Sequence, residues 1–85
     1  MKTEYDKQHD AAYFGFSEVD SAWQIKLDDA RIIDYAADGS VVGVEFISPS
    51  RGVNLADIPH AAEIEREARR LGLPVRSSRA ARAAG

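Results

Sequence analysis

The sequence contains no cysteine, which excludes disulfide bonds, thiolate metal sites and a cysteine nucleophile. It also lacks any apolar stretch close to the ~20 residues that a membrane-spanning helix needs. Its first ten residues are polar and do not resemble a signal peptide. The absence of disulfide staples is typical of small proteins in a reducing interior. We therefore expect a cytoplasmic protein.

A chain of 85 residues has room for one small domain. A domain of this length buries only about 60% of the surface that its unfolded chain exposes, so its stability is marginal. Chains of this size often gain stability from a partner subunit. The length therefore favours a homodimer.

Charge is distributed unevenly along the chain. Residues 1–50 hold four basic and ten acidic side chains, a net charge of −6, and residues 51–85 hold seven arginines and four acids, a net charge of +3. These values add up to the net charge of −3. The sequence thus predicts an acidic body and a basic C-terminal segment, whose arginines suit carboxylate or phosphate partners.

Four or five short strands are predicted from apolar residues that alternate with polar or small ones. Such runs cover residues 11–16, 22–27, 31–35 and 41–47. Turn-rich segments separate them, as expected for an antiparallel sheet. The early part of the chain is therefore predicted to be β-rich.

The step Asp38-Gly39 predicts a two-residue hairpin loop, because such a loop needs positive φ angles that glycine adopts freely and aspartate tolerates. With these residues at its centre, Tyr35 would face Val42, Ile33 would face Val44 and Arg31 would face Phe46. One side of the hairpin would then be apolar. The predicted core contains Ala12, Phe14, Phe16, Trp23, Ile25, Leu27, Ile33, Tyr35, Val42, Val44 and Phe46, with Ile64 and Leu71 from a later helix.

The other side of this hairpin is not a clean solvent face, since it carries Ile32, Val41 and Ile47. Three β-branched apolar residues there favour cover by another element or another chain. We predict a homodimer whose interface contains these three residues, or one that pairs exposed strand edges.

One helix is predicted over about residues 58–71. Pro59 suits a first helical turn, and Gly72 is typical of a helix end. Either Asp57 or Ile58 would cap its N-terminus, because the residue before a proline avoids helical angles.

A flexible arginine-containing tail, residues 75–85, is predicted to follow a single domain over residues 1–74, because the tail has no apolar stripe. The predicted fold class is α+β: an antiparallel meander of four or five strands with one C-terminal helix.

The most polar cluster of potential ligands is Asp6, His9 and Asp10. A carboxylate–imidazole set of this kind suits divalent metals, but aspartates in such a segment also form the turn between two strands. We favour the turn, and we expect no metal, no cofactor and no catalytic residue. His60 is interpreted as a surface histidine near the start of the helix.

A series of arginines is the remaining candidate for partner binding. It is either the solvated face of a helix with a solubilising tail, or a segment that orders on an acidic protein or on nucleic acid. The candidate partner-binding residues are Arg66, Arg69, Arg70, Arg76, Arg79 and Arg82.

Several short motifs resemble a small prokaryotic family catalogued as domain of unknown function 2283. They are Tyr5-Asp6, the segment from Asp10 to Phe14, Ile33-Asp34-Tyr35, and the run from Asp38 to Phe46. The resemblance covers about residues 1–50 and implies a compact β-rich domain without an assigned activity. Members encoded beside small toxin-like proteins raise the antitoxin hypothesis.

Three functions follow as hypotheses. The first is a non-catalytic interaction protein, an antitoxin-like partner of a small basic toxin, motivated by the acidic strand region. The second is a nucleic-acid-binding regulator that uses the C-terminal arginines. The third is a small metal-binding enzyme that uses Asp6, His9 and Asp10. We expect the first, because it needs no convergent site.

Overall fold

A computed structural model describes residues 1–76 of the chain. The chain divides into two compact units, Met1–Ser48 and a second that starts at Pro49. The sequence predicts one domain over residues 1–74, so the division at Ser48 is a feature that only the structure reveals.

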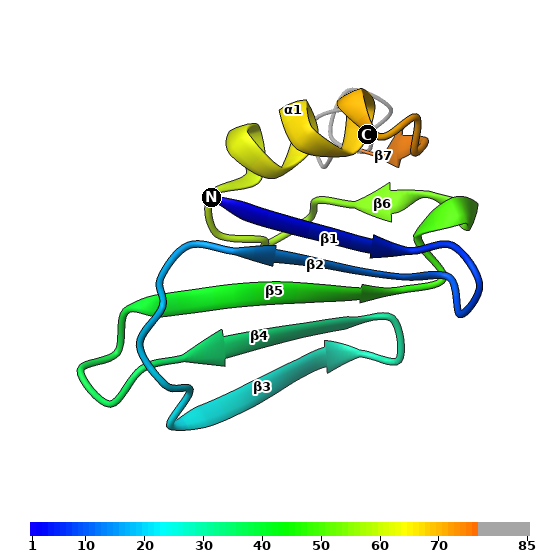
Figure 1. Cartoon of the computed structure of the whole chain (residues 1–85). Coiled ribbons are helices and arrows are strands. Elements are labelled where there is room, and N and C mark those ends of the chain that lie inside the picture. Colours follow the sequence, from blue (N-terminus) through cyan, green and yellow to red (C-terminus); the bar gives the residue numbers. More distant parts are fainter. Residues whose placement is uncertain (77–85) are drawn as a thin grey trace. The chain divides into compact units, whose positions relative to one another are not determined.

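The first unit is a five-stranded antiparallel sheet (Figure 1). Each strand is short and alternates between larger apolar residues and polar or small ones, the pattern of a sheet with two different faces. Together with one C-terminal helix, this sheet confirms the predicted α+β class. The strands are β1 (Lys2–Asp6), β2 (Ala11–Gly15), β3 (Trp23–Asp28), β4 (Arg31–Tyr35) and β5 (Val41–Ile47).

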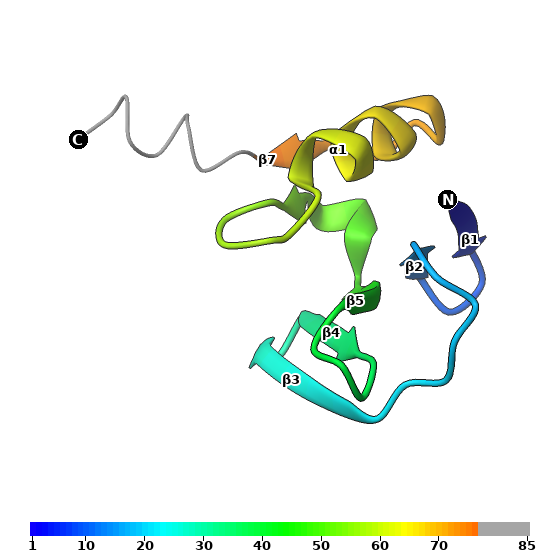
Figure 2. The same cartoon turned by 90° about the vertical axis from the view of Figure 1, so that its left-hand side faces the viewer.

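The strand order is β1-β2-β5-β4-β3, which differs from a simple meander because β5 lies between β2 and β4. Figure 2 shows these strands in a curved row, with β1, β2 and β5 nearly end on and with the segment after β2 running to β3 at the far edge. The most apolar strand, β5, therefore takes the centre, where both of its edges are paired.

The register brings apolar residues from neighbouring strands into one row. Phe14 and Ile33 both lie opposite Val44, and all three are almost completely buried. The next row contains Phe46 opposite Ala12, and the Phe14 and Phe46 rings meet edge to face at 5.7 Å. The predicted core is confirmed at these five positions.

Two predicted core residues are exposed instead. Trp23 and Ile25 each expose 44% of their surface, because β3 is the last strand of the sheet. Trp23 stacks on Tyr35 at 5.7 Å between ring centroids, so it is in contact with the sheet without being covered.

The hairpin between β4 and β5 has a three-residue loop, and the predicted two-residue loop is wrong. Ala36 N–H donates to the Ser40 carbonyl, and Gly39 N–H donates to the Ala36 carbonyl. Within this loop only Gly39 has a positive φ, 90°, which is typical of a type I turn followed by a glycine bulge. Consequently Tyr35 faces Val41 rather than Val42, although the predicted pairs Arg31–Phe46 and Ile33–Val44 are confirmed.

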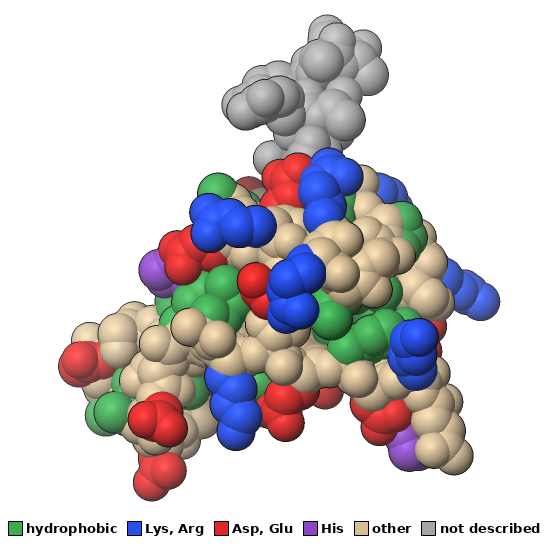
Figure 3. All heavy atoms as spheres, turned by 45° about the horizontal axis from the view of Figure 1, so that its top comes forward, with side chains coloured by type: hydrophobic (Ala, Val, Ile, Leu, Met, Phe, Trp, Pro, Cys, Tyr) green, Lys and Arg blue, Asp and Glu red, His purple; other side chains and the backbone are tan. Residues whose placement is uncertain are grey.

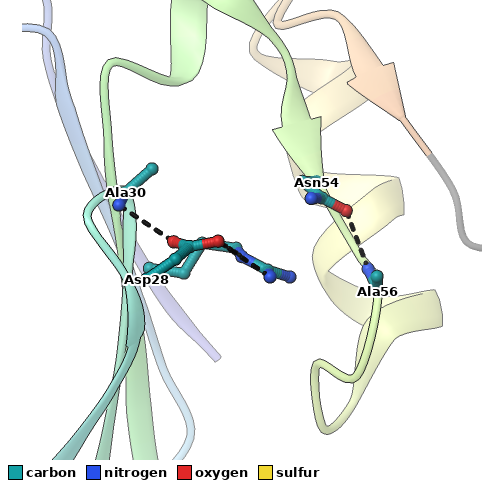
Figure 4. A network of polar contacts seen from close by, with 5 residues as sticks. Asp28, Ala30, Asn54 and Ala56 are labelled. Atoms are coloured by element: carbon teal, nitrogen blue, oxygen red, sulfur yellow. Dashed lines mark hydrogen bonds and ion pairs between the residues drawn. The ribbon is translucent and has the colours of Figure 1, made fainter.

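Arg31 occupies a buried position between Phe46 on β5 and Asp28 on β3. Its guanidinium donates to Asp28 through Nε at 3.0 Å, and Nη2 lies 2.9 Å from the same oxygen. The other Asp28 carboxylate oxygen accepts from Ala30 N–H (Figure 4). Asp28 thus holds the β3–β4 turn and neutralises a buried cation.

The second unit contains a parallel strand pair joined by a helix. Its elements are a 3₁₀ turn (Pro49–Arg51), β6 (Val53–Asn54), α1 (Ala61–Arg70) and β7 (Val75–Arg76). β6 and β7 pair in parallel, with Val53 opposite Val75. Parallel strands need a crossover of this kind. The predicted tail boundary after residue 74 therefore falls just before a strand.

The segment before α1 is held by local hydrogen bonds rather than by a side-chain cap. Asn54 accepts from Ala56 N–H (Figure 4). His60 is the N-cap residue, with a φ of 57° and no side-chain cap hydrogen bond. The helix thus starts three residues after the predicted start, because Pro59 and the left-handed His60 precede its first turn.

The helix ends in a Schellman motif, as Gly72 predicted. Gly72 N–H donates to the Arg69 carbonyl, and Leu73 N–H donates to the Ala68 carbonyl. The chain reversal buries Leu73, and the predicted core residue Leu71 is only half-buried. Ile64 and Ala68 are fully buried as the apolar stripe of the helix.

Candidate functional site

The Asp6–Asp10 cluster is the turn between β1 and β2, as predicted. Asp6 accepts from His9 N–H at 3.1 Å, and its other oxygen lies 2.7 Å from His9 Nδ1. These hydrogen bonds from His9 lower the pKa of Asp6. Asp10 adopts a φ of 51°, a conformation that aspartate tolerates in turns. The local geometry therefore has a structural explanation.

Within residues 1–76, no group of three or more histidine, cysteine, aspartate or glutamate side chains is arranged to hold a metal ion. Asp6 and His9 contact each other through an exposed pair, and His60 Nδ1 pairs with Glu63 at 3.3 Å. Both histidines thus have carboxylate neighbours within their own segments.

A different cluster lies on the polar face of the sheet, around Tyr13. The ring of Tyr13 covers the backbone of Gly43: a Cβ atom at residue 43 would clash with the Tyr13 hydroxyl group and ring. A Cβ at Gly15 would lie 3.0 Å from the opposite edge of the ring. The two glycines, one on β2 and one on β5, therefore leave a space that only an aromatic side chain from β2 fills.

Three carboxylates surround this tyrosine. Glu4 on β1 and Glu45 on β5 lie directly opposite Tyr13 on its two neighbouring strands. Asp34 on β4 lies opposite Gly43, and Gln24 donates to it at 2.7 Å. Partial burial and the charges of Asp34, Glu4 and Glu45 raise the pKa of Tyr13, so its hydroxyl group stays protonated.

One end of this cluster opens into a hollow of about 780 Å³. Its walls include Tyr13, Glu4 and Asp34 from the sheet, and Glu18 and Asp20 from the segment between β2 and β3. Lys2 is the basic side chain among its lining residues. The hollow is therefore predominantly acidic, and it holds hydrogen-bond acceptors for a cationic group.

The sequence missed this Tyr13 cluster, defined here as Tyr13, Glu4, Asp34 and Glu45. Three of the four belong to the motifs that carry the family resemblance, but those motifs lie on different strands. The signal that would have found the cluster is the pairing of β2 with β5. That pairing joins segments about thirty residues apart and leaves no local trace in the sequence.

The arginine candidates have different surroundings. Arg69 pairs with Glu65 at 2.8 Å, and Arg70 pairs with Glu67 at 2.7 Å, both within the exposed part of α1. Arg66 and Arg76 are exposed, and the Arg76 side chain lies over Gly52. Arg79 and Arg82 lie outside the residues that the structure describes.

The basic side chains form no continuous patch in the view of Figure 3. There, Lys and Arg side chains are spread over the surface and alternate with acidic and apolar ones. Duplex DNA binding draws on many phosphate contacts from one surface. The described arginines on this face do not provide such a surface by themselves.

Two of the three predicted dimer residues, Ile32 and Ile47, lie on the polar face of the sheet, whereas Val41 lies opposite Tyr35. Ile32 lies opposite Glu45, and Ile47 lies opposite Ala11. Ile47 exposes 41% of its surface, whereas Ile32 and Val41 are half-buried. The three residues therefore do not form one exposed apolar patch.

The fold and these surfaces define a small α+β protein with an acidic sheet face. In the described part of the chain, no helix has the length and apolar character required to cross a bilayer. A family profile described as "Protein of unknown function (DUF2283)" matches residues 2–50, and the chain belongs to this family. No curated protein and no solved structure matches the chain.

Proposed function

We propose that this protein is a non-catalytic interaction protein whose acidic sheet face binds a basic partner protein, as an antitoxin binds a small toxin. The observation that carries the proposal is the Tyr13 cluster. It presents one phenol and three carboxylates side by side on four neighbouring strands. A lysine or arginine side chain of a partner would bring the positive charge that complements these carboxylates.

The net charge of the first unit also supports binding of a basic partner. Residues 1–48 hold four basic and ten acidic side chains, a net charge of −6. A field of this sign accelerates encounters with basic proteins and repels phosphates. Within the cluster, Tyr13 adds a flat amphipathic ring, the kind of side chain that protein interfaces favour.

Rigid support for the site also favours binding. The Tyr13 ring packs against the backbone at Gly15 and Gly43, and Asp34 accepts a hydrogen bond from Gln24. A binding surface that is already ordered loses less conformational entropy when the partner binds. The site therefore has features of a preformed recognition surface.

The test uses synthetic peptides of matched length that are rich in arginine, rich in lysine or rich in glutamate. Titration of the full chain, followed by NMR shifts of the strand residues, should show that the basic peptides bind and the acidic peptide does not. Shifts should concentrate on Tyr13 and its strand neighbours. Because exposed ion pairs are weak, Glu45→Gln or Asp34→Asn should each lower the affinity by up to about fivefold.

The matched control is Asp29→Asn, which removes the same charge from a fully exposed turn residue next to β3. It should leave peptide binding nearly unchanged if the cluster, rather than the net charge, is responsible. Equal losses of peptide affinity in Asp29→Asn and Glu45→Gln would mean that binding depends on net charge and not on the Tyr13 cluster. Tight, strongly salt-dependent binding to duplex DNA would instead favour the arginine series.

A further inference from the structure

The outer edge of β3 is the most exposed apolar part of the sheet. β3 pairs with β4 on one side only, because it is the last strand in the order. Five of its six residues are exposed, including Trp23 and Ile25 at 44% each. An edge strand presents unpaired backbone donors and acceptors, which makes it a template for another strand.

The two edges of the sheet differ in how they are protected. β1 places the charged residues Lys2, Glu4 and Asp6 at its exposed positions. Charges at such positions are a common defence against edge pairing. β3 carries its two charges, Lys26 and Asp28, only in its second half, and the bulge lies between them. The first three residues of β3, Trp23 to Ile25, therefore leave an uncharged and regular edge.

From this geometry we propose that β3 pairs antiparallel with β3 of a second copy of the chain, and that Ile25 lies on the two-fold axis. The pairing joins two five-stranded sheets into one continuous sheet. It goes beyond the proposed binding of a basic partner, and it uses residues outside the Tyr13 cluster.

Self-complementarity is the reason for choosing a second copy as the occupant. With Ile25 opposite Ile25 of the partner strand, Trp23 falls opposite Leu27 and Gln24 falls opposite Lys26. Apolar residues then meet apolar residues on one face, and no like charges meet on the other. A two-fold interface requires this kind of self-matching surface.

The register centred on Lys26 instead of Ile25 pairs as many residues and keeps the same faces together, but it is disfavoured. It places Lys26 opposite Lys26 of the second copy, and like charges directly opposite each other are destabilising. A shift by one position would place apolar residues of one strand opposite polar residues of the other. The charge on Lys26 thus selects the Ile25-centred register.

The absence of native cysteine allows a direct test of this register. Directly opposite residues in antiparallel strands have Cα atoms about 4.5–5.5 Å apart, which is within the range of a disulfide. Under mild oxidation, Ile25→Cys should form a covalent dimer at least about tenfold faster than Gln24→Cys, which faces Lys26. A cysteine at another exposed isoleucine, Ile47→Cys, is the control for cross-linking by random collision and for pairing through the polar face.

Sedimentation of the unmodified full chain gives an independent measurement. A short strand interface is small, so dimers should appear between about 5 µM and about 500 µM. Ile25→Lys should raise the dimer dissociation constant more than about tenfold, because it places two charges at the axis. Ile47→Lys should not. Circular dichroism spectra of both variants should match that of the wild type, which separates loss of assembly from loss of folding.

Three results would overturn the proposal. One is a monomer throughout this concentration range. Another is a dimer that survives Ile25→Lys but is lost in Ile47→Lys, because this would place the interface on the polar face. The third is equal cross-linking at residues 24 and 25, because a single register cannot bring both positions next to their own copies.

Discussion

Strand β3 and the interior strands of the same sheet have similar sequences and different surroundings. Ile25 on β3 and Ile33 on β4 are directly opposite each other, are the same residue type and lie in the same cross-strand row. Ile33 exposes 2% of its surface, and Ile25 exposes 44%. Two isoleucines on adjacent strands therefore differ in kind: Ile33 is a core residue, and Ile25 is a candidate for an interface.

This difference shows what an alternating pattern means. The pattern marks a strand and its apolar side, but burial also depends on how many strands lie beyond it. β5 has β2 on one side and β4 on the other, so its Val44 is completely buried. β3 ends the sheet, so its apolar residues remain available for a second chain.

The largest expected effect comes from truncating the two matched isoleucines. Ile33→Ala should reduce the free energy of unfolding by about 2–5 kcal/mol, because it leaves a cavity in a packed row. Ile25→Ala should cost about 1 kcal/mol, since about half of its side chain already contacts water. Urea unfolding at low protein concentration, where the chain is monomeric, measures both. Equal losses would mean that β3 is covered within the monomer.

The β4–β5 loop gives the next effect. Gly39→Val should reduce the free energy of unfolding by about 1–3 kcal/mol, because a β-branched residue resists a positive φ. A Cβ atom at Gly39 meets nothing within 4 Å, so backbone strain is the whole cause. Gly39→Asn, which tolerates this conformation better, should cost clearly less. A similar loss for both would point to a steric cause that this loop geometry does not contain.

The contact between Tyr13 and Gly43 is tested by a double-mutant cycle. Gly43→Ala should destabilise the wild-type protein, because the new Cβ displaces the Tyr13 ring. In a Tyr13→Ala background the same change should be neutral or favourable, so the coupling free energy should be about 0.5–2 kcal/mol. Thermal unfolding of the four proteins gives this value, and additive effects would show that the ring does not lie over Gly43.

The smallest expected effect is on pH dependence. The hydrogen bond from Arg31, with help from Ala30 N–H, lowers the pKa of Asp28 below that of an unfolded aspartate. Its contribution to stability is therefore complete above the unfolded pKa of about 3.9 and is lost as the pH falls through the lower folded pKa. Asp6 and Asp38, in the other two hairpin turns, have pKa values lowered in the same direction.

Asp28→Asn should therefore be less stable than the wild type near neutral pH, and the difference should shrink in acid. Unfolding measured at several pH values between about 2 and about 6 tests this expectation. The control Asp29→Asn keeps the Asp28–Arg31 pair and should retain the acid-dependent loss of the wild type. A difference between Asp28→Asn and the wild type that stays constant with pH would contradict the assignment.

Local chemistry was predictable from the sequence. Gly39 marked a turn, Gly72 marked the end of α1, and the polar run at Asp6–Asp10 marked the first hairpin, because each depends on neighbouring backbone angles. The register near Ile33 and Val44 was also predictable, whereas Tyr35 was misplaced. A three-residue loop with a bulge and a two-residue loop contain the same Asp-Gly signal, and only the backbone geometry distinguishes them.

The candidate site could not be predicted in the same way. Tyr13, Glu45 and Asp34 stand on three strands, and the pairing of β2 with β5 brings them together. The burial of Arg31 likewise depends on its position opposite Phe46 and on the carboxylate of Asp28. These relations are long-range, so no local pattern encodes them.

The sequence by itself therefore determined strands β2 to β5, the positions of the turns, the helix end and the acidic character of the first unit, because these follow from neighbouring residues and from composition. The tertiary structure decided which apolar strand became the centre and which became the edge. It also decided which carboxylates surround Tyr13. The physical reason is that strand order fixes both burial and cross-strand neighbours, and strand order depends on pairing between segments that are distant in the chain.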